Sequence, residues 1–375
     1  MSGSLSVAKI PGYVFFLMCF LYYNPFFSRR SLPHPPKALW WFLGYLFVYA
    51  LNFILIPTEL LGSFFGRFLT LLQLIIFFWF CSNLLEDERM ARNVLLMFSI
   101  SSVLLAASAL IGAFESGVDV TQGSVSALEY NPATLGVLMA SAALTLIGLQ
   151  LAASFKGLSS KITLLALTLP PVAMMVSTGG RGALVVFITG CLVYVLPMWP
   201  SKWTLRNILI VLGVLVAALY IVFSNPFYLE RWNKAYYDAD SSGRERIYPA
   251  SIGMILERPM FGWGPVLHWH ELGARTGRLE RDEHNLFLHL LAEVGLVGAV
   301  PFLVGVWLCV RAAWKTRSAN LGSLPFALIV ASLVSNITDT YITRKVLWLL
   351  LALAVAAAHS AVQKKVILFK TAKAD

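Results

Sequence analysis

Polar side chains that could do chemistry stand at the borders of apolar segments in this chain. They are Arg181 in STGGRGALVVF, Arg244 in SSGRERIY, and His284 with Asn285 in DEHNLFLHLLAEVGLVG. Arginine stays protonated and presents a planar fork of N–H donors that matches phosphate oxygens in pairs. Histidine, with an ordinary pKa of about 6.5, can take up a proton or orient a hydroxyl group. The set predicts a receptacle for a diphosphate beside a group that handles a proton.

Each of the three strongest candidates also has a structural interpretation. Arg181 could snorkel to the membrane surface, and Arg244 could lie on a solvated helix face. A lone interfacial histidine such as His284 can simply complete a hydrogen-bond network. Their common position beside apolar segments favours a functional site, because polar groups are costly in hydrocarbon.

Further polar residues are expected to support this site. Asn285, His289 and Glu293 are spaced four apart, so successive members share a helix face, and His289 with Glu293 is predicted to be a supporting pair. Arg67 falls about two turns inside an apolar segment, so it should face the bundle interior or snorkel back to the surface. We predict that Arg67, Arg246 and Asn285 bind substrate.

The composition indicates a polytopic membrane protein. Of the 375 residues, 58% are hydrophobic and only 13% are charged, whereas a soluble domain has about 25% charged residues. The net charge of +10 would suggest nucleic acid as a partner of a soluble protein. Here it follows from basic loops and a basic tail, so acidic lipid surfaces and phosphate-bearing substrates are the expected partners, and nucleic acid is not.

The fold expected is an all-α bundle, because a membrane-spanning helix needs roughly 20 apolar residues and several segments approach that length. Eleven spans are predicted, with a twelfth allowed: 6–27, 38–57, 60–84, 93–114, 133–154, 160–177, 182–198, 205–224, 284–309, 321–337 and 345–363. Lys and Arg in the short loops assign the cytoplasmic side and place the candidate site on the external face.

The domain organisation expected is one integral membrane domain, 1–375, with a single large external loop at 225–283. Within that loop, GRERIYPASIGMILERP (243–259) predicts a short helix with an apolar side, ended by Pro259. FGWGPVLHWH (261–270) predicts a turn at the membrane interface. The loop is expected to cap the bundle.

Other motifs carry little weight. The DAD triplet (238–240) and the NIT sequon (336–338) lack supporting context, and the chain has no nucleotide-binding glycine loop, GxSxG elbow or zinc-ligand spacing. The four cysteines all fall in apolar segments and are expected to be small apolar helix residues. We therefore predict neither a metal nor a cofactor.

Taken in order, STGGRGALVVF, GRERIY with ERPMFGWG, and HNLFLHLLAEVGLVG resemble the motifs of the O-antigen ligase/polymerase superfamily. LEYNPATLGVLMA (128–140) resembles the Asn-Pro start of a helix in that family, which adds Asn131 to the candidate substrate-binding residues. The resemblance covers about residues 128–305. This chain has Gly180 before Arg181 where Ser is common, and Tyr248 where Trp is common.

The resemblance implies a GT-C-like membrane glycosyltransferase with Arg181, Arg244 and His284 as catalytic residues. An O-antigen ligase moves polysaccharide from undecaprenyl diphosphate to a sugar hydroxyl of lipid A–core, on the periplasmic face of the bacterial inner membrane, without metal. The motifs do not separate ligase from polymerase. The single large loop favours ligase, and the polar residues crowded toward one face argue against a transporter.

Overall fold

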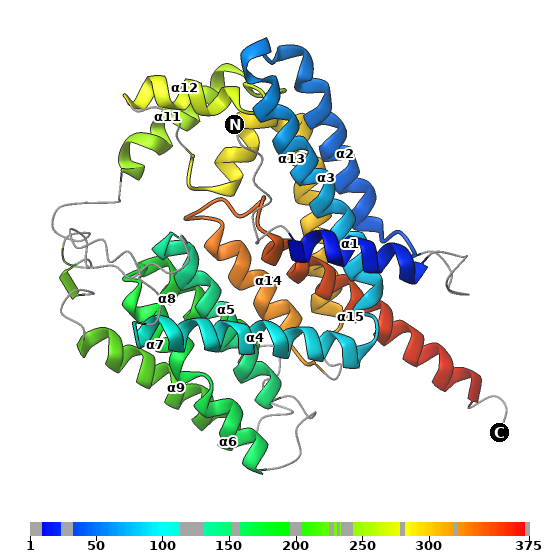
Figure 1. The fold of residues 1–375 in the computed structure, drawn as a ribbon, viewed down its shortest axis with the longest axis vertical. Coiled ribbons are helices and arrows are strands. Elements are labelled where there is room, and N and C mark those ends of the chain that lie inside the picture. The colour runs from blue at the N-terminus through cyan, green and yellow to red at the C-terminus, as the bar shows by residue number, and fades with distance from the viewer. Residues whose placement is uncertain are drawn as a thin grey trace.

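The chain is mainly helical in the part that the computed structural model describes, residues 10–23, 33–112, 131–151, 158–195, 205–224, 229–230, 233, 243–277, 282–317 and 321–371. Figure 1 shows the arrangement of the elements. The helices are α1 (Ile10–Tyr23), α2 (Lys37–Leu51), α3 (Leu61–Leu84), α4 (Glu88–Leu110), α5 (Pro132–Leu151), α6 (Leu158–Ala166), α7 (Leu169–Ser177), α8 (Arg181–Val195), α9 (Leu205–Ser224), α11 (Arg244–Glu257), α12 (Leu267–Thr276), α13 (Leu286–Lys315), α14 (Leu324–Ser335) and α15 (Lys345–Thr371).

The predicted all-α membrane fold is confirmed, and an apolar helical segment lies at each of the eleven predicted spans. Five of them are long and apolar enough to cross a membrane, namely Lys37–Leu55, Thr58–Leu84, Glu88–Leu110, Pro132–Leu151 and Leu286–Lys315. The other six are shorter apolar helices. The number of complete crossings therefore remains a prediction.

Two predicted continuous spans are interrupted. The segment 160–177 forms α6 and α7 rather than one helix, since Pro170 and Pro171 lack the N–H donors that would continue α6. Helix α13 is broken at Gly295, whose φ of 60° and ψ of −166° are not helical. Only glycine adopts this conformation without strain.

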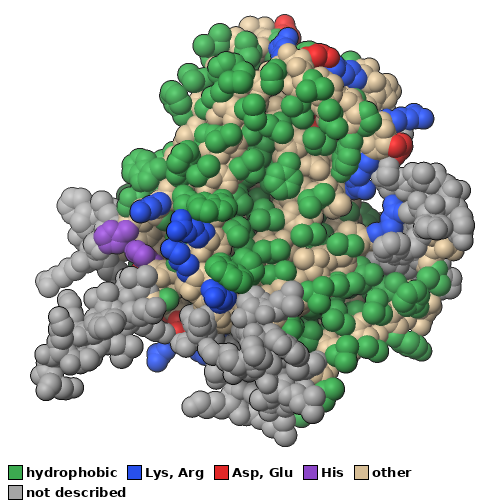
Figure 2. Space-filling model, turned by 180° about the vertical axis from the view of Figure 1, so that it is seen from behind, with side chains coloured by type: hydrophobic (Ala, Val, Ile, Leu, Met, Phe, Trp, Pro, Cys, Tyr) green, Lys and Arg blue, Asp and Glu red, His purple; other side chains and the backbone are tan. Residues whose placement is uncertain are grey.

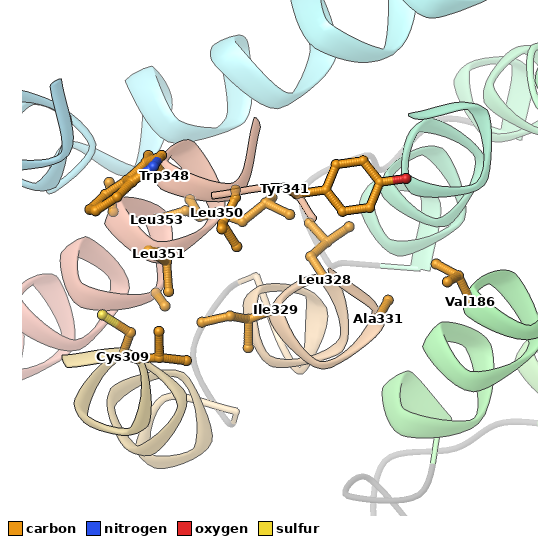
Figure 3. Packing of buried hydrophobic residues seen from close by; sticks show 14 of the residues in the cluster. Val186, Cys309, Leu328, Ile329, Ala331, Tyr341, Trp348, Leu350, Leu351 and Leu353 are labelled. Atoms are coloured by element: carbon orange, nitrogen blue, oxygen red, sulfur yellow. The ribbon is translucent and has the colours of Figure 1, made fainter. Parts of the chain in front are cut away.

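The core lies where α13, α14 and α15 meet the other helices. Helix α13 packs against α2 and α15, while α14 packs against α8 and α15. Figure 3 shows Trp348, Leu351 and Ile329 among the apolar side chains that fill this region. Trp348 Nε1 donates to the carbonyl oxygen of Ile342 over 2.7 Å, so the largest core side chain has its polar atom satisfied.

A cap of two helices, α11 and α12, covers one end of the bundle near α2, α3 and α13 (Figure 1). The predicted loop helix is confirmed as α11, with Ile247 and Met254 buried on its apolar side and Ile255 half-buried. The expectation of a turn across 261–270 is wrong for its second half, because α12 begins at Leu267. Helix α12 packs against α13, which covers its apolar face and stabilises the segment as a helix.

The outer surface suits a lipid environment. Figure 2 shows hydrophobic side chains across the broad middle of one face, with charged side chains gathered towards its edges. The four cysteines are free and buried, as predicted for apolar helix residues. The DAD triplet lies outside the described residues.

Candidate active site

The short segment between α14 and α15 is the point at which the candidate site assembles. The backbone oxygen of Ile337 accepts hydrogen bonds from Asn285 Nδ2 and Tyr248 Oη, each over 3.1 Å. The backbone oxygen of Thr338 accepts one from Arg244 Nη2 over 2.7 Å. The starts of α11 and α13 are therefore bound to the same four-residue stretch, 336–339.

The starts of α8 and α5 reach the same stretch. A methyl group added at Gly182, next to Arg181, would lie only 3.1 Å from Thr338 Oγ1. Thr134 in the first turn of α5 donates to Asp339 Oδ2 over 3.3 Å. Four helix N-termini thus converge, and each adds a partial positive charge that favours an anion.

His284 and Asp339 form the centre of the site. His284 Nδ1 lies 3.7 Å from Asp339 Oδ1, and 37% of the His284 side chain is exposed. The neighbouring Asp339 carboxylate raises the pKa of His284 above its ordinary value against the effect of burial. Burial acts to raise the pKa of Asp339, but the neighbouring His284 and the hydrogen bond from the Thr340 backbone outweigh it and lower that pKa. Because Nδ1 faces Asp339, Nε2 is the ring nitrogen of His284 that remains for a substrate.

The backbone at His284 is unusual and well supported. Its φ of 49° lies in the left-handed region, which residues other than glycine rarely adopt. The backbone N–H of His284 donates to Asp282 Oδ1 over 3.3 Å, and Thr340 Oγ1 donates to the same oxygen over 2.8 Å. These contacts turn the chain so that His284 faces the site and its neighbour Glu283 faces the interior.

Two predicted substrate-binding asparagines cap helices. Asn131 Oδ1 accepts from the Ala133 N–H over 2.9 Å at the start of α5, where Pro132 occupies the first helical position. Asn285 Oδ1 accepts from the N–H groups of Phe287 and Leu288 at the start of α13. Asn285 uses both of its side-chain polar atoms within the protein, and substrate binding by either asparagine stays a prediction.

The two remaining predicted residues lie apart from the convergence point. Arg246 is exposed on α11, two residues from Arg244 and so on a different side of the helix. Arg67 is half-buried on α3, with its guanidinium carbon 3.3 Å from the centre of the Trp269 ring of α12. Its partner is therefore the cap at one end of the bundle, and its role in binding substrate stays a prediction.

A second group of polar side chains lies behind the site and is buried. His268 of α12, Glu283 and His289 of α13 are at most 2% exposed in their side chains. His289 with Glu293 was predicted as a supporting pair, and His289 Nε2 lies 3.5 Å from Glu293 Oε2. Burial lowers the pKa of His268 below its usual value. Burial by itself would raise the pKa of Glu283. The adjacent His268 and His289 outweigh burial and lower the pKa of this carboxyl to about 2.

Within the described residues, two sets of side chains have the composition and closeness of metal ligands. One is Asp282, His284 and Asp339, and the other is His268, Glu283 and His289. In the first set, donors of the protein already face the carboxylates, since Thr340 donates to Asp282 and Thr134 donates to Asp339. Internal hydrogen bonding therefore accounts for the first set.

The sequence did not indicate Asp339, Thr338 or Glu283 as parts of these groups. Asp339 stands in NITDTYITR, a polar stretch between apolar helices on the side predicted to carry the site. That location is the one signal that could have identified it. Glu283 directly precedes the His-Asn pair but does not face it.

The comparison with protein families comes to the same part of the chain. Residues 162–303 match the family model described as O-antigen ligase. No curated protein matches the chain. The matched range contains Arg181, Arg244 and His284 together with the buried group, whereas Asp339 lies outside it. The segment 162–303 of this multi-pass membrane protein is therefore similar to the O-antigen ligase family.

Proposed function

We propose that this protein is an O-antigen ligase, which transfers polysaccharide from undecaprenyl diphosphate to a sugar hydroxyl of lipid A–core. The reaction takes place on the periplasmic face of the bacterial inner membrane. The observation that carries this proposal is the meeting of Arg244, His284 and the α8 start at Arg181 around Thr338 and Asp339. Cationic groups and helix N-termini suit a diphosphate there, and the histidine suits an attacking hydroxyl.

In this mechanism the acceptor hydroxyl attacks the anomeric carbon of the first donor sugar. The new C–O bond forms as the bond from that carbon to the diphosphate oxygen breaks, so the configuration inverts. The leaving diphosphate keeps the electron pair, and Arg181 and Arg244 stabilise its growing charge in place of a divalent metal. The hydroxyl proton passes to His284 Nε2, while Asp339 holds the imidazole from its Nδ1 side.

The lipid parts of both substrates need apolar surfaces between helices. A cavity of about 800 Å³ between the α6–α7 segment and α9 is lined almost wholly by apolar side chains, among them Leu165, Leu169 and Val214. A polyprenyl chain could enter such a groove sideways from the bilayer.

A polymerase of the same superfamily is the second candidate, since the same groups would join one repeat unit to another. A transporter of the lipid-linked glycan is a weaker third, because the candidate polar groups converge at one end of the bundle. We favour ligase because the chain carries one large loop between apolar segments.

The test is a transfer assay with purified protein, lipid A–core acceptor and an undecaprenyl-diphosphate glycan donor, run with EDTA. Wild type is compared with His284→Ala and Arg181→Ala. Matched controls are His359→Ala, a half-exposed histidine paired with Glu86, and Arg89→Ala, an exposed arginine in the first turn of α4.

Acceptor-dependent product that persists in EDTA and is lost in both site variants, but in neither control, would support the ligase. Donor-linked glycan that lengthens without lipid A–core would replace it with the polymerase. Lipid movement across vesicles without any glycan product would reject both.

A further inference from the structure

The buried group behind His284 contains polar atoms that the protein itself does not satisfy. His268 Nε2 and Glu283 Oε1 have no hydrogen-bond partner, although both side chains are completely buried. The two atoms lie 3.8 Å apart and face each other. Leaving such groups unpaired in the interior is costly, so something with positive charge or donor hydrogens belongs between them.

The position of the ring proton on His268 shows what kind of partner its Nε2 atom needs. Its Nδ1 lies 3.1 Å from the backbone oxygen of Gly264, and a carbonyl can only accept, so the ring proton is on Nδ1. Nε2 then presents a lone pair. The lone pair points towards Glu283, whose carboxylate oxygens are also acceptors.

His289 completes a third side of the same space. Its Nδ1 lies 2.8 Å from Glu283 Oε2, while its Nε2 faces Glu293 Oε2 at 3.5 Å. Tyr45 of α2 donates to that same Glu293 oxygen over 3.3 Å. Each histidine thus turns one ring nitrogen inwards and the other towards a carbonyl or carboxylate, which is how metal-ligating histidines are oriented.

We propose that His268 Nε2, the Glu283 carboxylate and His289 Nδ1 bind one divalent cation, for which Zn²⁺ is the best match. Two histidines and one carboxylate are a known zinc ligand set, in which a water molecule fills the fourth tetrahedral position. Ligand atoms around tetrahedral zinc lie about 3.4 Å apart, and the observed separations of 2.8 and 3.8 Å fall on either side of that value. Binding releases the proton that His289 Nδ1 otherwise shares with Glu283.

The cation would fasten the cap to the membrane helices. His268 belongs to α12, His289 to α13, and Glu283 to the turn that holds His284 in its left-handed conformation. A metal enclosed by side chains at most 2% exposed does not touch a substrate. Its role is structural, and the proposal holds whether the protein is a ligase or a polymerase.

The test measures metal in the full-length protein purified in detergent. Wild type, His268→Gln and His270→Ala are each incubated with Zn²⁺, desalted and assayed for bound metal. A Co²⁺-loaded sample is scanned for visible d–d absorption. His268→Gln has a similar volume, and His270 is a half-buried histidine on the same helix but outside the group. Gel filtration in detergent verifies that each variant is folded.

We expect about one metal per chain, with intense tetrahedral Co²⁺ bands, in wild type and His270→Ala, and at least about a tenfold loss in His268→Gln. A folded wild type without stoichiometric metal or Co²⁺ bands would overturn the proposal. The unpaired atoms would then be explained by a buried water molecule beside a His289–Glu283 ion pair. Equal metal in folded His268→Gln would also overturn it. Neither readout depends on glycosyl transfer, so this test can fail while the proposed function stands.

Discussion

Glu283 and His284 are consecutive in the chain, yet their side chains belong to regions with opposite surroundings. The Glu283 side chain is completely buried among histidines, whereas 37% of the His284 side chain is exposed beside Asp339. Around His284 the acidic oxygens receive hydrogen bonds from protein donors, whereas in the buried group three polar atoms, His268 Nε2, Glu283 Oε1 and His289 Nε2, have none. The first region has the accessibility that a substrate needs, and the second has the enclosure of a structural site.

We assign the proposed chemistry to the exposed region around His284. The variant with the largest expected effect on activity is therefore His284→Ala. We expect glycosyl transfer to fall by about 10²- to 10⁴-fold, because the group that receives the hydroxyl proton is lost. Thermal stability in detergent should change little, since the side chain is partly exposed. Initial rates at saturating donor measure the effect, and a rate within twofold of wild type would remove His284 from the mechanism.

Arg244→Lys tests whether the charge or the planar fork matters. Lysine keeps the charge but cannot donate to Thr338 and bind phosphate oxygens in the same planar geometry. We expect a loss of about 10²-fold in kcat, the scale of one transition-state donor. Arg258→Lys is the control, because Arg258 stacks on Trp263 of the cap at 4.0 Å and should retain the wild-type rate. Equal losses in the two variants would indicate general damage to the cap.

On the buried side, the strongest test of the fold is Gly295→Ala. The new methyl group would lie 2.4 Å from backbone atoms of Met260, and φ of 60° is unfavourable for alanine. We expect the free energy of unfolding to fall by about 1–3 kcal/mol, read as a lower melting temperature in detergent. Gly213→Ala, where no atom lies within 4 Å, is the matched control and should not melt earlier. A Gly295→Ala variant that melts at the wild-type temperature would mean that the turn at 259–264 does not pack closely against α13 at this break.

Asp339→Asn has the smallest expected effect. It tests whether Asp339 supports His284 from behind or contacts the substrate. Asparagine can still accept from the Thr340 N–H with its one side-chain oxygen. Its NH2 group cannot accept from Thr134 Oγ1, and the charge that orients the His284 imidazole is lost. We expect about a tenfold lower kcat with an unchanged KM for donor, on the scale of a supporting hydrogen bond to a charged group. A rise in KM alone would place Asp339 against the substrate instead of behind His284.

Much of the fold followed from local patterns. Apolar length predicted a helix at every span, and the pattern from Arg244 to Pro259 predicted α11. Pro170 and Pro171 could have predicted the division of α6 from α7. The break at Gly295 could not be foreseen, since its freed backbone groups are satisfied only by a turn about 35 residues earlier. There the N–H of Leu296 donates to Pro259 and the carbonyl of Ala292 accepts from Trp263.

What the sequence by itself determined is the class of protein, the apolar helices, and the prediction that Arg181, Arg244 and His284 share one face. These depend on hydropathy, charge and short motifs, which are local. Only the tertiary structure decided that Asp339 stands behind His284, that Arg67 stacks on Trp269, and that His268, Glu283 and His289 face one another. The physical reason is that each of these relations joins side chains that different helices, or the turns at their ends, bring together. Their spacing along the chain has no motif, and the packing of α12, α13 and the α14–α15 segment alone sets the distances.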